Sequence, residues 1–322
     1  MNGYKIRRLQ KSEFHLLLPL MKDCFGLELD IEYFEWKYLH NPAGEFVGFV
    51  AISEENEISA YYGVIPETYK IDEEIKVIYQ SCDTMTHSKH RRKGLFKHLA
   101  NACFDYLRER EKLFVMGFGG GQSTPGFIKF GWTHCFDIRN YFYPLQFTFL
   151  ARMYKNVNEN IEKLEEFEGI SDLIIKSNFQ ARVHSHKTLD VFNWRISNPR
   201  YKYEVLSYKE NKEYLGYICF YKQANKIFLF DYYFKTPKSR KELFHKLKSI
   251  LFENKFKGIV AFCQENSAFS KPLKENNFIA NPFSRGPLSE KTPFILYTDK
   301  YKMNQYSDSL NWSINSFDHD AL

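Results

Sequence analysis

The chain has 322 residues, of which 44% are hydrophobic and 26% are charged, and its formal net charge is +6. These proportions are typical of globular proteins, and the length favours two domains. No dense basic stripe with interleaved aromatic residues is present, so nucleic acid is not expected as a partner. The six cysteines form no C-x-x-C pair and no histidine cluster accompanies them, so no metal site is expected. The longest apolar stretch, 16–21, is too short to span a bilayer and no signal pattern precedes it, which predicts a cytoplasmic protein without a membrane partner.

Strands and helices alternate along the first 150 residues. Strand-like patterns cover 4–9, 46–52, 58–64, 76–86 and 113–117, and the polar residues 54–56 predict a hairpin turn. Apolar residues recur at helical spacing after Gly94, at Leu95, Leu99, Cys103 and Leu107. Residues 151–175 are charged and helix-prone, which predicts a helical connector. Residues 303–322 are polar and are expected to form a tail that lies across the body or is partly disordered.

Four features of the first half return in the same order in the second half. Trp36-Lys37 ahead of Asn41-Pro42 returns as Trp194-Arg195 ahead of Asn198-Pro199. A two-strand pattern follows each, in the second copy at 214–221 and 226–234. Arg-Lys-Gly-Leu-Phe at 92–96 returns as Arg-Lys-Glu-Leu-Phe at 240–244, and 262–267 with 276–278 echo 119–132. The chain is therefore predicted to contain two copies of one α/β unit, at 1–150 and 176–302.

The segment 91–96 has the chemistry of an anion site. A helix N-terminus presents unpaired backbone N–H groups and the positive end of the helix dipole. Gly94 lets a phosphate approach this backbone closely, because it has no Cβ. Arg91, Arg92 and Lys93 add positive charge on the same side. We therefore expect a phosphate-bearing ligand here.

This loop resembles the Q/R-x-x-G-x-G/A loop with which the GCN5-related N-acetyltransferase (GNAT) superfamily binds the pyrophosphate of coenzyme A. Phe96 departs from the Gly or Ala usual in the family, and a ring directed into the core would leave the amides free. Residues 119–132 look like the later family motif, at which the central strands splay apart. The resemblance implies tandem GNAT-like domains, each a mixed central sheet flanked by helices. In the second copy Glu242 replaces Gly94, so cofactor binding is expected to be lost there.

The resemblance also implies site residues. Coenzyme A, as acyl-CoA co-substrate, is expected to contact Thr84, Met85, Thr86, Arg91, Arg92, Lys93, Gly94, Leu95, Phe96, Ser123 and Phe127. Asp83 is a candidate general base, acting directly or through a water, or else a structural acid like its counterpart Asp231. His134 is a second candidate catalytic residue that faces the cleft, or else it lies in the core or on the surface. Ser123 either bonds the pantetheine or the leaving sulfur, or caps a helix. Glu35 is a candidate substrate-binding residue. Trp36 and Trp194, with their basic neighbours, either line the acceptor pocket or anchor the core.

Within the superfamily, the tandem arrangement resembles acyltransferases of surface-polysaccharide (O-antigen) biosynthesis. This resemblance implies transfer of an acetyl or 3-hydroxybutyryl group to the amine of a nucleotide-linked amino sugar, such as a dTDP-3-amino-3,6-dideoxyhexose. Two alternatives remain: an aminoacyl-tRNA-dependent peptidoglycan-bridge transferase, and a non-catalytic acyl-CoA-binding protein. A tandem pair can supply the contact that single-domain relatives obtain by dimerising, so a monomer is expected.

Overall fold

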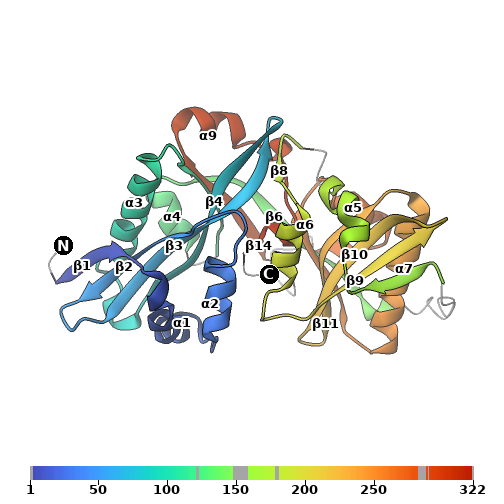
Figure 1. Cartoon of the computed structure of the whole chain (residues 1–322), viewed down its shortest axis with the longest axis horizontal. Helices are drawn as coiled ribbons and strands as arrows, with labels where there is room; N and C mark the ends of the chain where they lie inside the picture. Colours follow the sequence, from blue (N-terminus) through green and yellow to red (C-terminus); the bar gives the residue numbers. More distant parts are fainter. Residues whose placement is uncertain are drawn as a thin grey trace.

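One mixed sheet runs through both halves of the molecule. The computed structural model describes residues 3–120, 123–147, 159–177, 181–281, 288 and 290–320. In this part of the chain the strand order is β1-β2-β3-β4-β5-β14-β6-β12-β11-β10-β9-β7. Figure 1 shows two halves side by side along the long axis, with helices packed against the sheet and the C-terminus between the halves. The predicted α/β class, with two units of mixed sheet flanked by helices, is confirmed.

The two halves contain the same succession of elements, except that the second has two additional short strands. The first half consists of β1 (Tyr4–Arg8), α1 (Leu17–Phe25), α2 (Ile31–Tyr38), β2 (Val47–Ser53), β3 (Ile58–Ile71), β4 (Glu74–Thr86), α3 (Leu95–Arg108), β5 (Phe114–Phe118), α4 (Thr124–Lys129) and β6 (Thr133–Pro144). The second consists of β7 (Ile161–Leu164), α5 (Ser171–Lys176), β8 (Val183–Ser185), α6 (Leu189–Ile196), β9 (Tyr203–Glu210), β10 (Glu213–Gln223), β11 (Lys226–Phe234), α7 (Pro237–Glu253), β12 (Gly258–Gln264), α8 (Ser270–Glu275), β13 (Ile279–Ala280) and β14 (Lys291–Thr298).

In the first half, helices cover both faces of the sheet, and the side chains of β3 alternate between the two helical layers. Along β3, Tyr61 and Ile65 pack with α1 and α2, whereas Tyr62 and Val64 pack with α3. This is the period of two that a buried strand requires. The apolar residues predicted at helical spacing all lie buried on one stripe of α3: Leu95, Leu99, Cys103 and Leu107.

The parallel pairing of β4 with β5 has its counterpart in β11 with β12. The counterparts of β2 and β3 are therefore β9 and β10. Our alignment of the repeat at 214–221 and 226–234 was wrong by one strand, because these segments are β10 and β11. The sequence analysis missed β9.

Each half takes one strand from the other. β14, from the second copy, lies between β5 and β6 and pairs antiparallel with both. β6, from the first copy, pairs in turn with β12. The last long strands of the two copies are thus exchanged, and this exchange joins the halves into one sheet.

Two tryptophans, expected either to line a pocket or to anchor the core, meet between the halves. The indole Nε1 of Trp36 donates to the carbonyl of Trp194 (2.7 Å), and Nε1 of Trp194 donates to the carbonyl of Trp36 (2.9 Å). Their rings stack with centroids 5.4 Å apart, and both residues are buried. This reciprocal pair is the contact of a pseudo-two-fold axis, and it satisfies both indole donors.

Trp36→Ala is expected to lower the free energy of unfolding by about 3–5 kcal/mol, the usual cost of emptying a buried aromatic site. A double-mutant cycle with Trp194→Ala, followed by urea unfolding, should show coupling of about 0.5–3 kcal/mol. Unchanged stability together with a raised KM for the acceptor would instead place Trp36 in a binding pocket.

The connector and the tail differ from their predictions. The expected helix at 151–175 is wrong for Ile161–Leu164, which is the strand β7 paired with β9, although α5 follows; residues 151–158 lie outside the described residues. In the C-terminal segment, α9 (Lys300–Tyr306) is mostly exposed or half-buried, whereas residues 312–320, which begin with β15 (Trp312–Ser313), are mostly buried and run between the halves rather than over the surface. In the described ranges, no helix has the length and apolar character needed to cross a membrane.

Candidate active site

The site begins where β4 and β5 part. The two strands are paired in parallel only from Tyr79 and Val115 to Ser81 and Gly117. β4 continues to Thr86 with β3 as its partner, whereas β5 ends at Phe118 and the chain turns into α4. The splay exposes one edge of β4 beyond Ser81 to a ligand.

The predicted anion loop lies at the open end of this splay. Gly94 is the N-cap of α3 and has a φ of +75°, a conformation that glycine adopts without strain. Arg91 donates through Nε to the carbonyl of Thr86 (3.2 Å), and Lys93 donates to the Tyr4 hydroxyl (2.9 Å). The helix N-terminus is thus flanked by two cations.

A cavity of about 380 Å³ adjoins this loop, and it is lined by Cys24, Phe25, Thr84, Thr86, Arg91, Phe96, Ser123, Gly126 and Phe127. The ring of Phe96 packs beside Phe127 and Phe130, at 5.1 and 5.2 Å between centroids. The bulky residue therefore forms an apolar wall shared with α4 and leaves the amides of the α3 N-terminus uncovered. The residues here suit the pyrophosphate and pantetheine of coenzyme A.

Not all predicted contact residues face this cavity. Thr84, Thr86, Arg91, Phe96, Ser123 and Phe127 line it. Met85 and Leu95 point into the cores on either side of the sheet, as strand and helix periods require. Arg92 is exposed and has a φ of +63°. Gly121 and Gln122 of the later motif lie outside the described residues.

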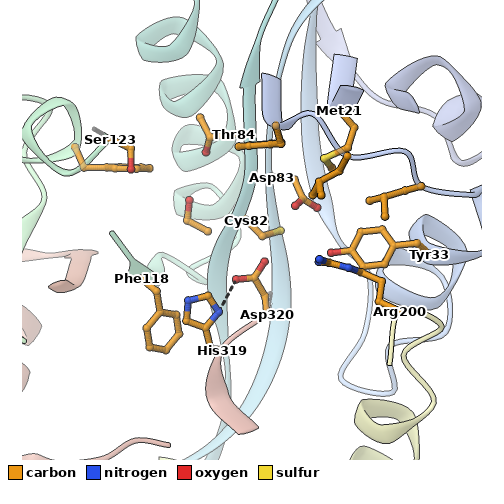
Figure 2. Close-up of a pocket in the computed structure, with 15 residues that line it drawn as sticks. Met21, Tyr33, Cys82, Asp83, Thr84, Phe118, Ser123, Arg200, His319 and Asp320 are labelled. Atoms are coloured by element: carbon orange, nitrogen blue, oxygen red, sulfur yellow. Dashed lines mark ion pairs between the residues drawn. The ribbon is translucent and has the colours of Figure 1, made fainter. Parts of the chain in front are cut away.

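A second cavity of about 270 Å³ continues from the first, with which it shares Phe25, Thr84, Ser123 and Phe127. Its polar lining is supplied by Asp83 of β4, by Arg200 from the second half, and by His319 and Asp320 of the C-terminal segment (Figure 2). Apolar residues of α1 and the segment after it, such as Met21 and Leu29, complete the wall. The C-terminal segment thus completes a cavity that begins in the first half.

Asp83 occupies an irregular point of β4. The register with β3 shifts between Tyr61 and Gly63, and Asp83 has a φ of +46°. The hydroxyl of Tyr38 donates to Asp83 Oδ2 (2.7 Å), and the ammonium of Lys37 lies 2.9 Å from the same oxygen. Since both partners use Oδ2, Oδ1 is available to a ligand in the cavity.

Lys37 joins two carboxylates. Its side chain is 0% exposed, and Nζ lies 2.7 Å from Asp320 Oδ2 as well as near Asp83. Burial alone disfavours the ammonium, but Asp320 and Asp83 outweigh it and raise the pKa of Lys37. Burial likewise opposes ionisation of Asp320, yet Lys37 and His319 hold the pKa of that carboxyl below its usual value. The cavity thus keeps ionised groups beside the splay.

His319 lies against Phe118, with the two rings stacked at 4.4 Å. Its carbonyl accepts a hydrogen bond from Arg195 (2.6 Å), which fixes the chain at this point. Burial lowers the pKa of His319 to about 4, so the imidazole is neutral at pH 7. His319, Asp320 and Arg200 were not identified from the sequence, and Lys37 was considered only as the basic neighbour of Trp36.

The structure does not bring the other candidates to the cavity. His134 on β6 contacts Asp137 (2.9 Å), and its side chain is 46% exposed. Trp36 is buried against Trp194, and Glu35 lies on α2 outside both cavities.

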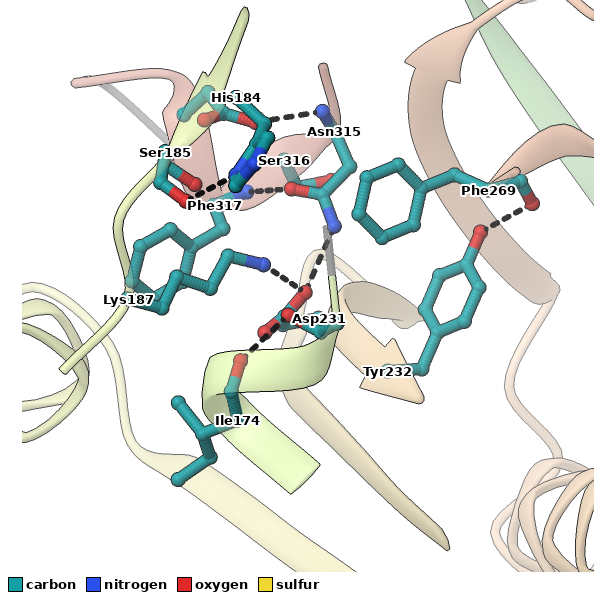
Figure 3. A network of polar contacts seen from close by, with 12 residues as sticks. Ile174, His184, Ser185, Lys187, Asp231, Tyr232, Phe269, Asn315, Ser316 and Phe317 are labelled. Atoms are coloured by element: carbon teal, nitrogen blue, oxygen red, sulfur yellow. Dashed lines mark hydrogen bonds and ion pairs between the residues drawn. The ribbon is translucent and has the colours of Figure 1, made fainter. Parts of the chain in front are cut away.

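The second copy has no equivalent open splay. Ser316 donates to the carbonyls of Leu229 and Phe262, so the C-terminal segment bridges β11 and β12 where a ligand would lie. Asp231, the counterpart of Asp83, is fully buried and bonds Lys187 and Asn315 (Figure 3). It also accepts a hydrogen bond from the hydroxyl of Tyr217. Glu242 lies inside α7, which begins at Pro237, and not at a helix N-terminus as expected. The longer helix and the bridged splay, in addition to the carboxylate of Glu242, distinguish this half from the open site of the first.

Comparison with known proteins agrees with this geometry. Residues 5–135 match the acetyltransferase (GNAT) domain family. The chain has a GNAT fold. One similar solved structure is a conserved protein of unknown function from Enterococcus faecalis V583, with a TM-score of 0.69 and 10% sequence identity over 92% of this chain and 73% of that one. A GCN5-related N-acetyltransferase from Anabaena variabilis has a TM-score of 0.66 and 10% identity over 91% of this chain and 72% of that one. The Saccharomyces cerevisiae N-myristoyltransferase with bound myristoyl-CoA has a TM-score of 0.64 and 13% identity over 92% of this chain and 79% of that one.

No curated protein matches the chain in sequence. The matched domain contains the anion loop, the splay and Asp83, and it ends at residue 135 within β6. The domain and the fold support an N-acyltransferase, and the GNAT domain supports acyl-CoA as its donor.

Proposed function

We propose that the protein transfers an acyl group from acyl-CoA to the amine of a nucleotide-linked amino sugar. The observation that supports this most is the continuity of the two cavities. One cavity begins at the cationic N-terminus of α3, and the next ends among Asp83, His319 and Asp320. The donor's pyrophosphate would bind at 91–96 and its pantetheine along the free edge of β4. The thioester would then reach the cavity that contains Asp83 and Asp320.

Asp83 is the proposed general base. Its Oδ1 takes a proton from the acceptor ammonium, and the neutral nitrogen then attacks the thioester carbonyl. The new C–N bond forms and the C–S bond breaks, and the departing thiolate takes up the proton that the nitrogen loses as it becomes an amide. Lys37 and Tyr38 hold the carboxylate at Oδ2 and so orient Oδ1. Holding amine and thioester together supplies a further share of the rate.

The proposal is tested by titration with coenzyme A and by thiol release with several acyl-CoA donors and amino-sugar nucleotides. Binding without acceptor-stimulated thiol release would favour a sensor. Failure to bind coenzyme A would remove the proposal and reopen the aminoacyl-tRNA alternative.

Asp83→Asn is expected to lower kcat by about 100-fold or more, the usual contribution of a general base. Coenzyme A should bind Asp83→Asn as tightly as the wild type, because Asp83 does not line the cavity beside Arg91. His319→Gln, the companion variant, should lose less of the rate than Asp83→Asn. An unchanged kcat in Asp83→Asn would assign the base to another group.

A further inference from the structure

Arg200 lies on a turn that occurs once in each copy. In the second copy, Asn198 Oδ1 accepts the backbone N–H of Arg200 (3.0 Å), and in the first copy, Asn41 Oδ1 accepts that of Ala43 (2.9 Å). The same Asn-Pro turn thus carries an arginine in one copy and an alanine in the other. The arginine is directed at the open cavity of the first half. The splay of the second half is filled by the C-terminal segment.

The guanidinium of Arg200 has no anionic partner among the described residues. It lies over the rings of Tyr201 and Tyr33, at 5.2 and 5.7 Å from the centroids, and Figure 2 shows it beside Tyr33. The buried lysines of the two copies differ in this respect, since Lys37 pairs with Asp83 and Asp320 and Lys187 pairs with Asp231. Within the described ranges, Arg200 is thus a half-buried cation that is positioned by a turn and two rings and is not neutralised.

The position of Arg200 separates it from the donor's phosphates. It lines the cavity that holds Asp83, and not the one beside Arg91 and the α3 N-terminus. A planar guanidinium pairs with carboxylate or phosphate through two parallel hydrogen bonds, and more strongly where water is partly excluded. An anion at Arg200 would therefore belong to the acceptor.

We propose that the acceptor is an amine bearing a phosphate or carboxylate group, and that Arg200 binds this group. That the acceptor is an amine rests on the acyl transfer proposed above. The new element is the anionic group of the acceptor, by which Arg200 of the second half selects it. Ala43, at the matching turn, lines neither of the two cavities described above.

The test compares acceptors that differ only in the anion. An amino sugar 1-phosphate is compared with the free amino sugar, and an amino acid with its amide. Arg200→Gln should lower kcat/KM for the anionic member of the preferred pair by about 10- to 100-fold. The neutral member should be unaffected, and Arg200→Lys should restore part of the loss. Lys202→Gln, an exposed change of the same charge two residues on, is the matched control.

Anion binding tests the role of Arg200 without measuring catalysis. Inorganic phosphate and acetate are titrated into protein saturated with coenzyme A, and Arg200→Gln should bind one of them at least tenfold more weakly. Equal anion binding by variant and wild type, or an equal loss for charged and neutral acceptors, would overturn the role of Arg200. Failure to bind coenzyme A would instead overturn the proposed function.

Discussion

Lys37→Met is expected to lower the free energy of unfolding at pH 7 by about 3–5 kcal/mol, because it leaves buried carboxylates without their cation. In the wild type, Lys37 lies within 2.9 Å of both Asp83 and Asp320 and is inaccessible to water. The variant has a methionine of similar length, so the cavity created is small and the lost charge dominates. Chemical unfolding of the two proteins measures the difference.

The pH dependence of this difference identifies its cause. The pKa of Asp320 is depressed in the folded wild type, so its contribution to stability is present above its unfolded pKa and is lost as pH falls. Without Lys37, burial is expected to raise the pKa of Asp320, and the resulting destabilisation is relieved as pH falls. The gap between the two proteins should therefore shrink from pH 7 to pH 4.

Lys187→Met is the matched control, since Lys187 is equally buried and pairs with Asp231 in the second copy. It should cost a similar free energy of unfolding, with KM for the acceptor unchanged. A gap for Lys37→Met that stays constant with pH would show that lost packing, and not charge, is responsible.

Gly94→Glu is expected to weaken coenzyme A binding by at least 100-fold. A carboxylate about 4 Å from a pyrophosphate costs about 4 kcal/mol near a protein surface, which corresponds to about 1000-fold in affinity. A Cβ at this position meets nothing closer than His98 at 3.9 Å, so the fold accommodates it. The positive φ adds a cost of about 1–2 kcal/mol in stability. Calorimetric titration with coenzyme A gives the affinity.

Gly94→Ala separates charge from backbone strain, because it carries the same φ cost without the carboxylate, and it should bind within about fivefold of the wild type. Glu242→Gly, the reverse change in the second copy, should create no second site, since the C-terminal segment still bridges β11 and β12. Unaltered affinity in Gly94→Glu would show that the pyrophosphate binds elsewhere.

The sequence predicted the features that depend on neighbouring residues. The N-terminus of α3, its glycine and its buried stripe are local patterns, and each lies where it was expected. The cluster of Lys37, Asp83 and Asp320 depends instead on contacts between residues that are distant in the sequence. Lys37 and Asp320 are 283 positions apart, and no spacing rule relates them.

The C-terminal segment was misjudged because its composition is polar. Several polar groups near its end are buried with partners: Asp318 accepts from Tyr69, Gln80 donates to the carbonyl of Asp318, and Gln80 also accepts the N–H of Asp320. Burial of polar residues with satisfied hydrogen bonds leaves no signal in a hydropathy pattern. The strand β7 was misjudged for a similar reason, since pairing with β9 overrode its helical propensity.

The exchange of β6 and β14 also limits how substrates can enter. Many two-lobed enzymes open by rotating rigid lobes about a flexible hinge. Here the two halves are joined by a hydrogen-bonded sheet, which the Trp36–Trp194 pair reinforces. Opening by lobe rotation would break ladder hydrogen bonds and separate stacked rings. Short segments at the rim of the cavity that contains Asp83, such as the residues between α1 and α2, which include Leu27 and Leu29, are not tied into this sheet. We therefore expect substrate access to depend on local loop motion, which is faster than lobe closure.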